Sequence, residues 1–147
     1  MIQILLFALA LLAGAATALQ IGVNSQLRVG LGNPFQAGLV SFAVGTIALA
    51  IIALPQGLQW NFAQTMSLPW WVWTGGLLGA YFVTALIILA PRLGASTLIG
   101  LALTGQLLVS LVLDHYGLLG FPVQRLSLPR MLGAALLIAG VVLIRRF

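Results

Sequence analysis

The chain has no cysteine, no lysine and no glutamate, and it holds one aspartate, Asp114, and one histidine, His115. The missing cysteines exclude disulfide bonds, thiolate nucleophiles and cysteine-ligated metal sites. Asp114 and His115 are adjacent, so on a helix they point about 100° apart, and there is no second pair to complete a metal chelate. Because a nucleophile–base set and a phosphate-binding glycine loop are also missing, the sequence predicts no enzyme, metal site or cofactor.

Charged residues are few and almost all positive. They make up 5% of the chain against 62% hydrophobic residues, which is too little polar surface for a water-soluble globule of this size. The net charge of +5 comes from six arginines that are scattered with no basic face, so they do not predict binding to nucleic acid. They are typical of topology signals and headgroup anchors in an integral membrane protein.

Five apolar stretches fill most of the chain, and each is about long enough to cross the roughly 30 Å hydrocarbon core as a helix. A β-barrel would need alternating polar and apolar residues, which are absent. The sequence therefore predicts an all-α multi-pass protein with a single transmembrane domain over 1–147. The expected helices are 2–23, 34–54, 69–90, 94–113 and 128–144.

Prolines and tryptophans mark the expected ends of these helices. Pro34, Pro69 and Pro129 stand at first turns, and Pro91 is expected to close the third helix. The three-residue gap 91–93 then predicts a tight antiparallel hairpin between the third and fourth helices. The loop 56–68 should lie flat on the membrane surface, because it is part of an aromatic belt. The belt consists of Trp60, Trp70, Trp71 and Trp73.

The arginines are divided between the two faces of the membrane with little bias. An odd number of helices puts the termini on opposite sides, so Arg125 and Arg130 share the N-terminal face. Arg28, Arg92, Arg145 and Arg146 share the other face. This weak bias favours insertion in both orientations and an antiparallel homodimer, a ten-helix bundle whose two copies act as inverted repeats. A single orientation with the C-terminus in the cytoplasm is the equally weighted alternative.

Small residues recur every four positions in the first three expected helices, which allows helix backbones to approach closely. Most of them are expected to serve packing within one subunit, and some a dimer interface. They are Ala10, Gly14, Ala18 and Gly22, then Ala37, Ser41 and Gly45, and finally Gly75 and Gly79.

Two polar stripes lie at membrane depth. Gln20 and Asn24 share one face of the first expected helix, and Gln106 begins a similar stripe on the fourth. Polar groups in lipid are costly and usually face the bundle interior or a water-filled cavity. Taken singly, each residue is explained equally well by a hydrogen bond to a neighbouring helix, but the set favours a cavity. Asp114 is expected to form a structural ion pair with Arg130 across the loop between them.

The runs Gln20–Leu27, Gly32–Ala37 and Gly105–Gly117 resemble those of the YdcZ-like family, five-helix proteins of unassigned function in the drug/metabolite transporter superfamily. The resemblance covers essentially the whole chain, and its most specific part is the stretch Gly105–Gly117. It implies single, paired or fused forms, with single-copy members forming dual-topology homodimers. The related small multidrug-resistance transporters carry a glutamate on the first helix, where this chain has the neutral Gln20 and Asn24. An amide-lined site suits a neutral solute better than proton-coupled exchange.

The leading hypothesis is a transporter of small organic solutes in the bacterial inner (plasma) membrane, which works by alternating access across the homodimer. The expected substrate-binding residues are the amides of Gln20, Asn24 and Gln106 and the aromatic walls of Trp73 and Tyr81. The alternative is a non-transporting membrane scaffold or lipid-binding subunit, in which the polar stripes only hold helices together.

Overall fold

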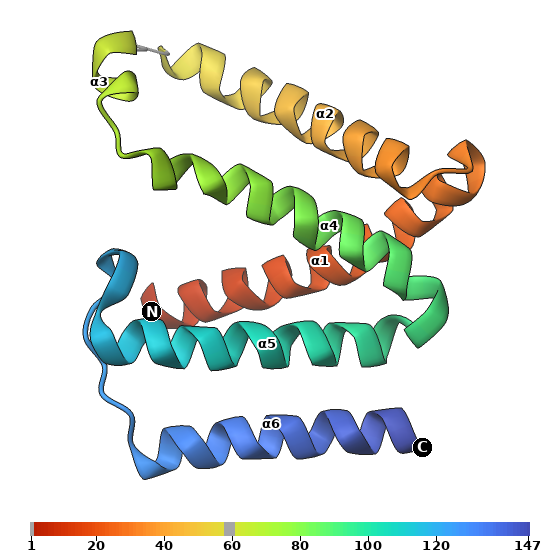
Figure 1. The fold of residues 1–147 in the computed structure, drawn as a ribbon, viewed down its shortest axis with the longest axis vertical. Coiled ribbons are helices and arrows are strands. Elements are labelled where there is room, and N and C mark those ends of the chain that lie inside the picture. The colour runs from red at the N-terminus through yellow and green to blue at the C-terminus, as the bar shows by residue number, and fades with distance from the viewer. Residues whose placement is uncertain (1, 58–60) are drawn as a thin grey trace. The chain divides into compact units, whose positions relative to one another are not determined.

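A computed structural model describes residues 2–57 and 61–147. All regular elements in these two ranges are helical (Figure 1). The long helices are α1 (Ile2–Leu31), α2 (Pro34–Ala53), α4 (Thr74–Leu93), α5 (Ala95–Tyr116) and α6 (Leu128–Arg146). The short ones are η1 (Leu54–Gln56), α3 (Phe62–Met66), η2 (Trp70–Trp73) and η3 (Leu118–Gly120).

Five helical segments of the described ranges are long and apolar enough to cross a membrane, which confirms the predicted all-α, five-span architecture. The chain divides into two compact units, Met1–Arg92 and Leu93–Phe147. The first unit contains α1, α2 and α4, and the second contains α5 and α6.

The first helix is longer than expected, because α1 continues to Leu31 instead of ending near residue 23. Its 30 residues span about 45 Å at 1.5 Å per residue. The polar residues after Val23 are compatible with a helix, and no proline or glycine-driven turn interrupts them before Gly32. Asn24 and Arg28 therefore belong to the helix itself.

A two-residue turn joins α1 to α2. Gly32 takes the left-handed conformation at φ +71°, where a side chain would be strained, and its N–H donates to the Arg28 carbonyl at 2.8 Å. Asn33 then caps α2, because its Oδ1 accepts hydrogen bonds from the N–H groups of Phe35 and Gln36 at 2.8 and 3.4 Å. The two helices pack against each other as an antiparallel hairpin (Figure 1).

The third expected helix differs at both ends. It begins as the 3-10 turn η2, and regular α-helix starts at Thr74, whose hydroxyl donates to the Trp71 carbonyl at 2.7 Å. Pro91 does not close it, since α4 runs on to Leu93 and ends before Gly94 at φ +75°. Pro91 has no N–H to donate to the carbonyl four residues earlier, so the helix loses one hydrogen bond there and continues for two more residues.

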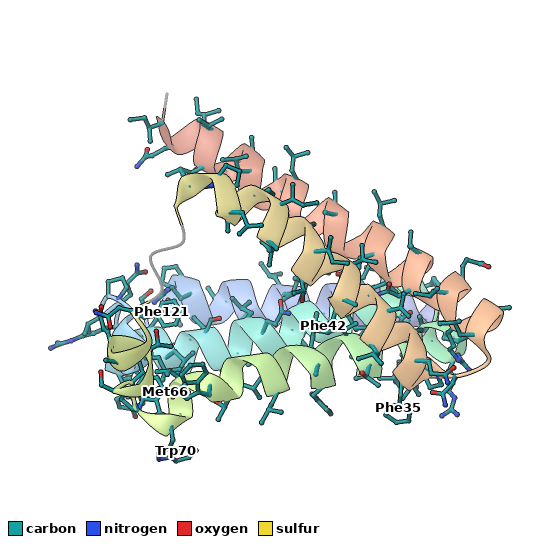
Figure 2. The ribbon with its side chains drawn as sticks, turned by 90° about the horizontal axis from the view of Figure 1, so that it is seen from above. Phe35, Phe42, Met66, Trp70 and Phe121 are labelled. Carbon is teal, nitrogen blue, oxygen red and sulfur yellow. The ribbon has the colours of Figure 1, made fainter. Side chains whose placement is uncertain are left out.

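The aromatic belt is described in part. Trp70, Trp71 and Trp73 are 79%, 47% and 51% exposed on η2, while Trp60 lies outside the described residues. Met66 at the end of α3 and Trp70 lie near each other at one end of the first unit (Figure 2). Their exposure suits side chains that rest in the headgroup region.

Small residues bring α2 and α4 together in the first unit. Ala37 and Gly38 are buried, and a Cβ at Gly38 would lie 3.2 Å from Thr84 Oγ1. One further contact places the Phe42 ring 3.7 Å from a Cβ built at Gly79. A side chain at Gly38 would therefore crowd Thr84, whereas a Cβ at Gly79 would make an ordinary van der Waals contact with Phe42.

The second unit is an α5–α6 hairpin in which a glycine of α5 faces α6. A Cβ at Gly100 would meet Val141 Cγ2 at 2.8 Å and Val141 Cγ1 at 3.3 Å. The hairpin turns after Gly117, which caps α5 at φ +63° and donates its N–H to the Leu113 carbonyl. The helices α5 and α6 lie side by side (Figure 1), and a side chain at Gly100 would overlap Val141.

We expect Gly100→Ala to destabilise the second unit by about 1–3 kcal/mol, because the added methyl group overpacks the contact with Val141. Gly105→Ala is the matched control, since a Cβ there has nothing within 4 Å. The free energy of unfolding in detergent, followed by circular dichroism, measures both. Adding Val141→Ala should restore part of the loss in Gly100→Ala, and equal stability of the two alanine variants would contradict the packing argument.

Candidate solute-binding site

A polar pocket lies between α1 and α2 in the first unit, and it is partly open. Its volume is about 230 Å³. It is lined by Gln20 from α1 and by Ser41, Phe42, Gly45, Thr46 and Leu49 from α2. These α2 residues form one stripe, because residues three or four apart share a helix face. The pocket has room because a Cβ at Gly45 would meet nothing within 4 Å.

The polar side chains that line this pocket have no hydrogen-bond partner among the described residues of the first unit. The hydroxyl of Thr17 on α1 donates to the Ala13 carbonyl at 2.9 Å, the usual way for a threonine in a helix to satisfy its donor. Among the described residues of the first unit, Gln20, Ser41 and Thr46 make no side-chain hydrogen bond. In hydrocarbon, such groups need water, a ligand or another chain as a partner.

The pocket lies at the depth of the bilayer centre. The 20 residues of α2 span about 30 Å, the thickness of the hydrocarbon core. Ser41 and Thr46 lie on either side of the α2 midpoint, within about 5 Å of it along the axis. Gln20 is 12 residues before Gly32, the turn residue, and so lies about 18 Å from it along α1. Substrate sites of transporters are typically found at this depth.

Asn24 lies one turn beyond Gln20 on α1 and is buried, with 5% of its surface exposed. It does not line the polar pocket. Its burial agrees with the rule that polar side chains in membrane helices face protein and not lipid.

A second, apolar groove of about 560 Å³ lies along α4 in the first unit. It is lined by Phe35, Ala80, Tyr81, Thr84, Ala85, Ile88 and Leu89. Phe35 comes from the start of α2, where Figure 2 shows it at one end of that helix. Tyr81 is 75% exposed, so it borders this groove as a wall and is not enclosed in it.

The remaining predicted residues are Trp73 in the first unit and Gln106 in the second. Trp73 is on η2, and it lines neither the polar pocket nor the apolar groove. Gln106 is exposed on α5 in the second unit. The structure therefore brings Gln20 into one pocket and Tyr81 into another, and it does not assemble the five predicted contacts into one described site.

Asp114 and Arg130 form an ion pair in the second unit, with Arg130 Nη2 2.6 Å from Asp114 Oδ2. Arg130 Nη1 also donates to the Gln124 carbonyl at 2.8 Å, and the Gln124 N–H donates to the Asp114 carbonyl at 2.8 Å. The Leu126 N–H donates to His115 Nδ1 at 3.1 Å. These bonds fasten the loop between α5 and α6 to both helices, so the only acid and the only histidine have a structural role here.

The described residues contain no group of three or more His, Asp or Glu side chains close enough to hold a metal ion. The pocket contacts that the sequence interpretation missed are the hydroxyls of Ser41 and Thr46. In the sequence, Ser41 belongs to the stripe of small residues that predicts helix packing. The spacing of the hairpin could have identified these hydroxyls. Gln20 and Gly45 are equally far from the Gly32–Asn33 turn, so in a hairpin Gln20 lies opposite the part of α2 that carries Ser41 and Thr46.

Comparisons with known proteins agree with this membrane architecture. A family model described as "Putative inner membrane exporter, YdcZ" matches residues 5–143. The chain is 34% identical over 111 residues to a protein of Escherichia coli K12 named "Inner membrane protein YdcZ". The matched region covers 75% of this chain and 74% of that protein. No solved structure matches the chain.

We expect the Asp114–Arg130 pair to contribute about 0.5–1 kcal/mol of coupling energy, because its side chains are 22% and 29% exposed and solvent screens them only in part. A double-mutant cycle with Asp114→Ala and Arg130→Ala measures this value in the unfolding free energy. Arg125→Ala, in the same loop and exposed, is the control and should change stability by less than about 0.5 kcal/mol. Additive effects of the two alanine substitutions would show that the ion pair is energetically neutral.

Proposed function

The chain belongs to the YdcZ family of inner-membrane proteins, and from this premise we propose that it transports a small organic solute across that membrane. It is a multi-pass inner-membrane protein with five membrane-spanning helices in its described ranges. The family description as an exporter supports transport, and it is also what supports a non-enzymatic role.

The polar pocket at the α1–α2 hairpin is the main support for this proposal. Gln20, Ser41 and Thr46 present an amide and two hydroxyls near the bilayer centre. Keeping polar groups at this depth costs free energy, which a merely structural hairpin would avoid by using apolar residues. A solute that forms hydrogen bonds with these groups offsets that cost.

Alternating access is proposed to require two copies in opposite orientations. Five spans are an odd number, so one copy cannot contain an inverted repeat of equal halves. A second copy inserted upside down supplies the symmetry that many transporters build from inverted repeats. The weak bias in the arginines, two on one face and four on the other, supports insertion both ways. In this proposal Asn24, Gln106, Trp73 and Tyr81 contribute to the solute path as the two copies come together.

The apolar groove along α4 favours a second candidate function. Apart from Tyr81 and Thr84, its lining is entirely apolar, which suits an acyl chain. A lipid-binding or scaffold subunit would use this groove and leave the polar pocket without a solute. Solute flux distinguishes the two functions.

We expect Gln20→Leu to lower solute flux in proteoliposomes about tenfold, because a lost hydrogen bond of roughly 1.4 kcal/mol changes affinity by that factor. The solute is the one that most raises the melting temperature of the purified protein in a screen of metabolites and cationic drugs.

Gln26→Leu is the matched control for this flux measurement, since Gln26 is an exposed amide on α1 that does not line the pocket. Its flux should equal that of the unmodified protein. Undiminished flux in Gln20→Leu would remove Gln20 from the site, and an absence of flux for every stabilising solute would favour the lipid-binding function.

We expect Phe147→Cys to be labelled by a membrane-impermeant maleimide in about half of the molecules in intact cells, because both orientations insert. The chain has no cysteine of its own, so the label reports one position. Ser127→Cys, in the loop before α6 and hence on the opposite face, should also be labelled in about half. Complete labelling of one variant together with no labelling of the other would show a single orientation.

A further inference from the structure

We infer that the pocket between α1 and α2 accepts neutral, hydrogen-bonding solutes and excludes charged ones, with Ser41 and Thr46 as specificity-determining residues. This inference rests on the proposed transport function and adds the class of its substrate. The composition of the pocket, its volume and the position of the charges in the first unit support it.

The lining of the pocket has no ionisable side chain. Its polar groups are one amide and two hydroxyls, and each can both donate and accept a hydrogen bond. These groups match the carbonyl, amide or hydroxyl groups of a neutral solute. They offer no opposite charge to an ammonium or a carboxylate, and an unpaired ion at this depth is strongly disfavoured.

Charges elsewhere in the first unit are too distant to compensate. Between residues 1 and 92 the charged side chains are Arg28 and Arg92, in the last turns of α1 and α4. Arg28 is eight residues from Gln20, about 12 Å along the helix. The single acid of the chain, Asp114, is paired with Arg130 in the second unit. A second copy of the same chain brings no other carboxylate, so a cation gains no counter-charge from a homodimer either.

The hydroxyls on α2 are available to a solute. Thr17 and Thr104 donate to main-chain carbonyls four residues earlier, at 2.9 and 2.8 Å, whereas Ser41 and Thr46 make no such bond in the described part of α2. Together with Gln20 they present polar groups from both helices to the same space. A solute held between them forms hydrogen bonds at two sides.

The size of the pocket restricts the solute further. Its volume of about 230 Å³ is below the range of roughly 300–1,000 Å³ that is usual for drug-sized ligands. The Phe42 ring and the Leu49 side chain form its apolar walls. The fitting class is a neutral metabolite with hydroxyl or amide groups and a short apolar portion.

Cysteine variants of the full chain, in proteoliposomes, test this selectivity directly, because the native chain contains no cysteine. Ser41→Cys and Thr46→Cys are treated with three methanethiosulfonates that differ in one group: hydroxyethyl (neutral), sulfonatoethyl (anionic) and trimethylammonioethyl (cationic). The thiolate displaces methanesulfinate and forms a mixed disulfide, and this needs water at the thiol. Mass spectrometry gives the rate for each reagent.

We expect the neutral reagent to modify both variants at least about tenfold faster than either charged reagent, since the pocket offers no counter-charge. Val44→Cys, at the same depth on α2 but outside the pocket lining, should react with none of them. Ser127→Cys, in the exposed loop before α6, should react with all three at similar rates.

Two results would overturn the inference: charged reagents that modify Ser41→Cys and Thr46→Cys as fast as the neutral one, or no modification of either variant by any reagent. The measurement does not depend on transport. Selective modification combined with undiminished flux in Gln20→Leu would therefore reject Gln20 in the transport proposal while keeping the neutral pocket. Flux of a charged solute with the expected labelling pattern would place its path outside this pocket.

Discussion

The free-energy cost of an unpaired polar group in hydrocarbon is the constraint on which the rest of this structure depends. It requires the spans to be helices, because only there does each backbone donor find an acceptor within its own segment. It also places the charged side chains at helix ends and in loops. The same cost makes the exceptions informative. Gln20, Ser41 and Thr46 remain polar in the membrane-spanning part of α1 and α2, and water, a ligand or another chain is needed to satisfy them.

Glycine has two separate uses in these helices. At Gly38 and Gly100 the missing side chain lets a neighbouring helix approach closely, as the short distances to Thr84 and Val141 show. At Gly45 it leaves space instead, and that space is the polar pocket. The recurrence of small residues in the sequence includes Gly45, but it does not include Gly38 or Gly100. Which glycines pack and which leave a cavity depends on the side chain that the facing helix presents.

Much of the membrane architecture could be predicted from sequence, because length and hydropathy limit the possible folds in a bilayer. Helix ends were less predictable. The apolar run stops near Val23, but α1 continues to Leu31, since polar residues are tolerated in a helix that extends beyond the hydrocarbon. Proline was expected to end α4 at Pro91, yet the conformation of Gly94 sets its end. Hydropathy indicates whether a segment lies in lipid or in water, whereas the backbone conformation of the turn residues decides where the helix ends.

The sequence by itself determined the solvent, the helical class, the number of spans and the scarcity of ionisable groups, because each follows from composition or from the length of an apolar run. Only the tertiary structure decided which polar residues share a space. Gln20 and Thr46 are far apart along the chain, and the hairpin at Gly32 brings them to one pocket, while Asn24, one turn away, is buried outside it. The physical reason is that the neighbours of a side chain depend on which helices pair and how each is rotated about its axis. Contacts between helices determine both, and the periodicity of a single helix does not.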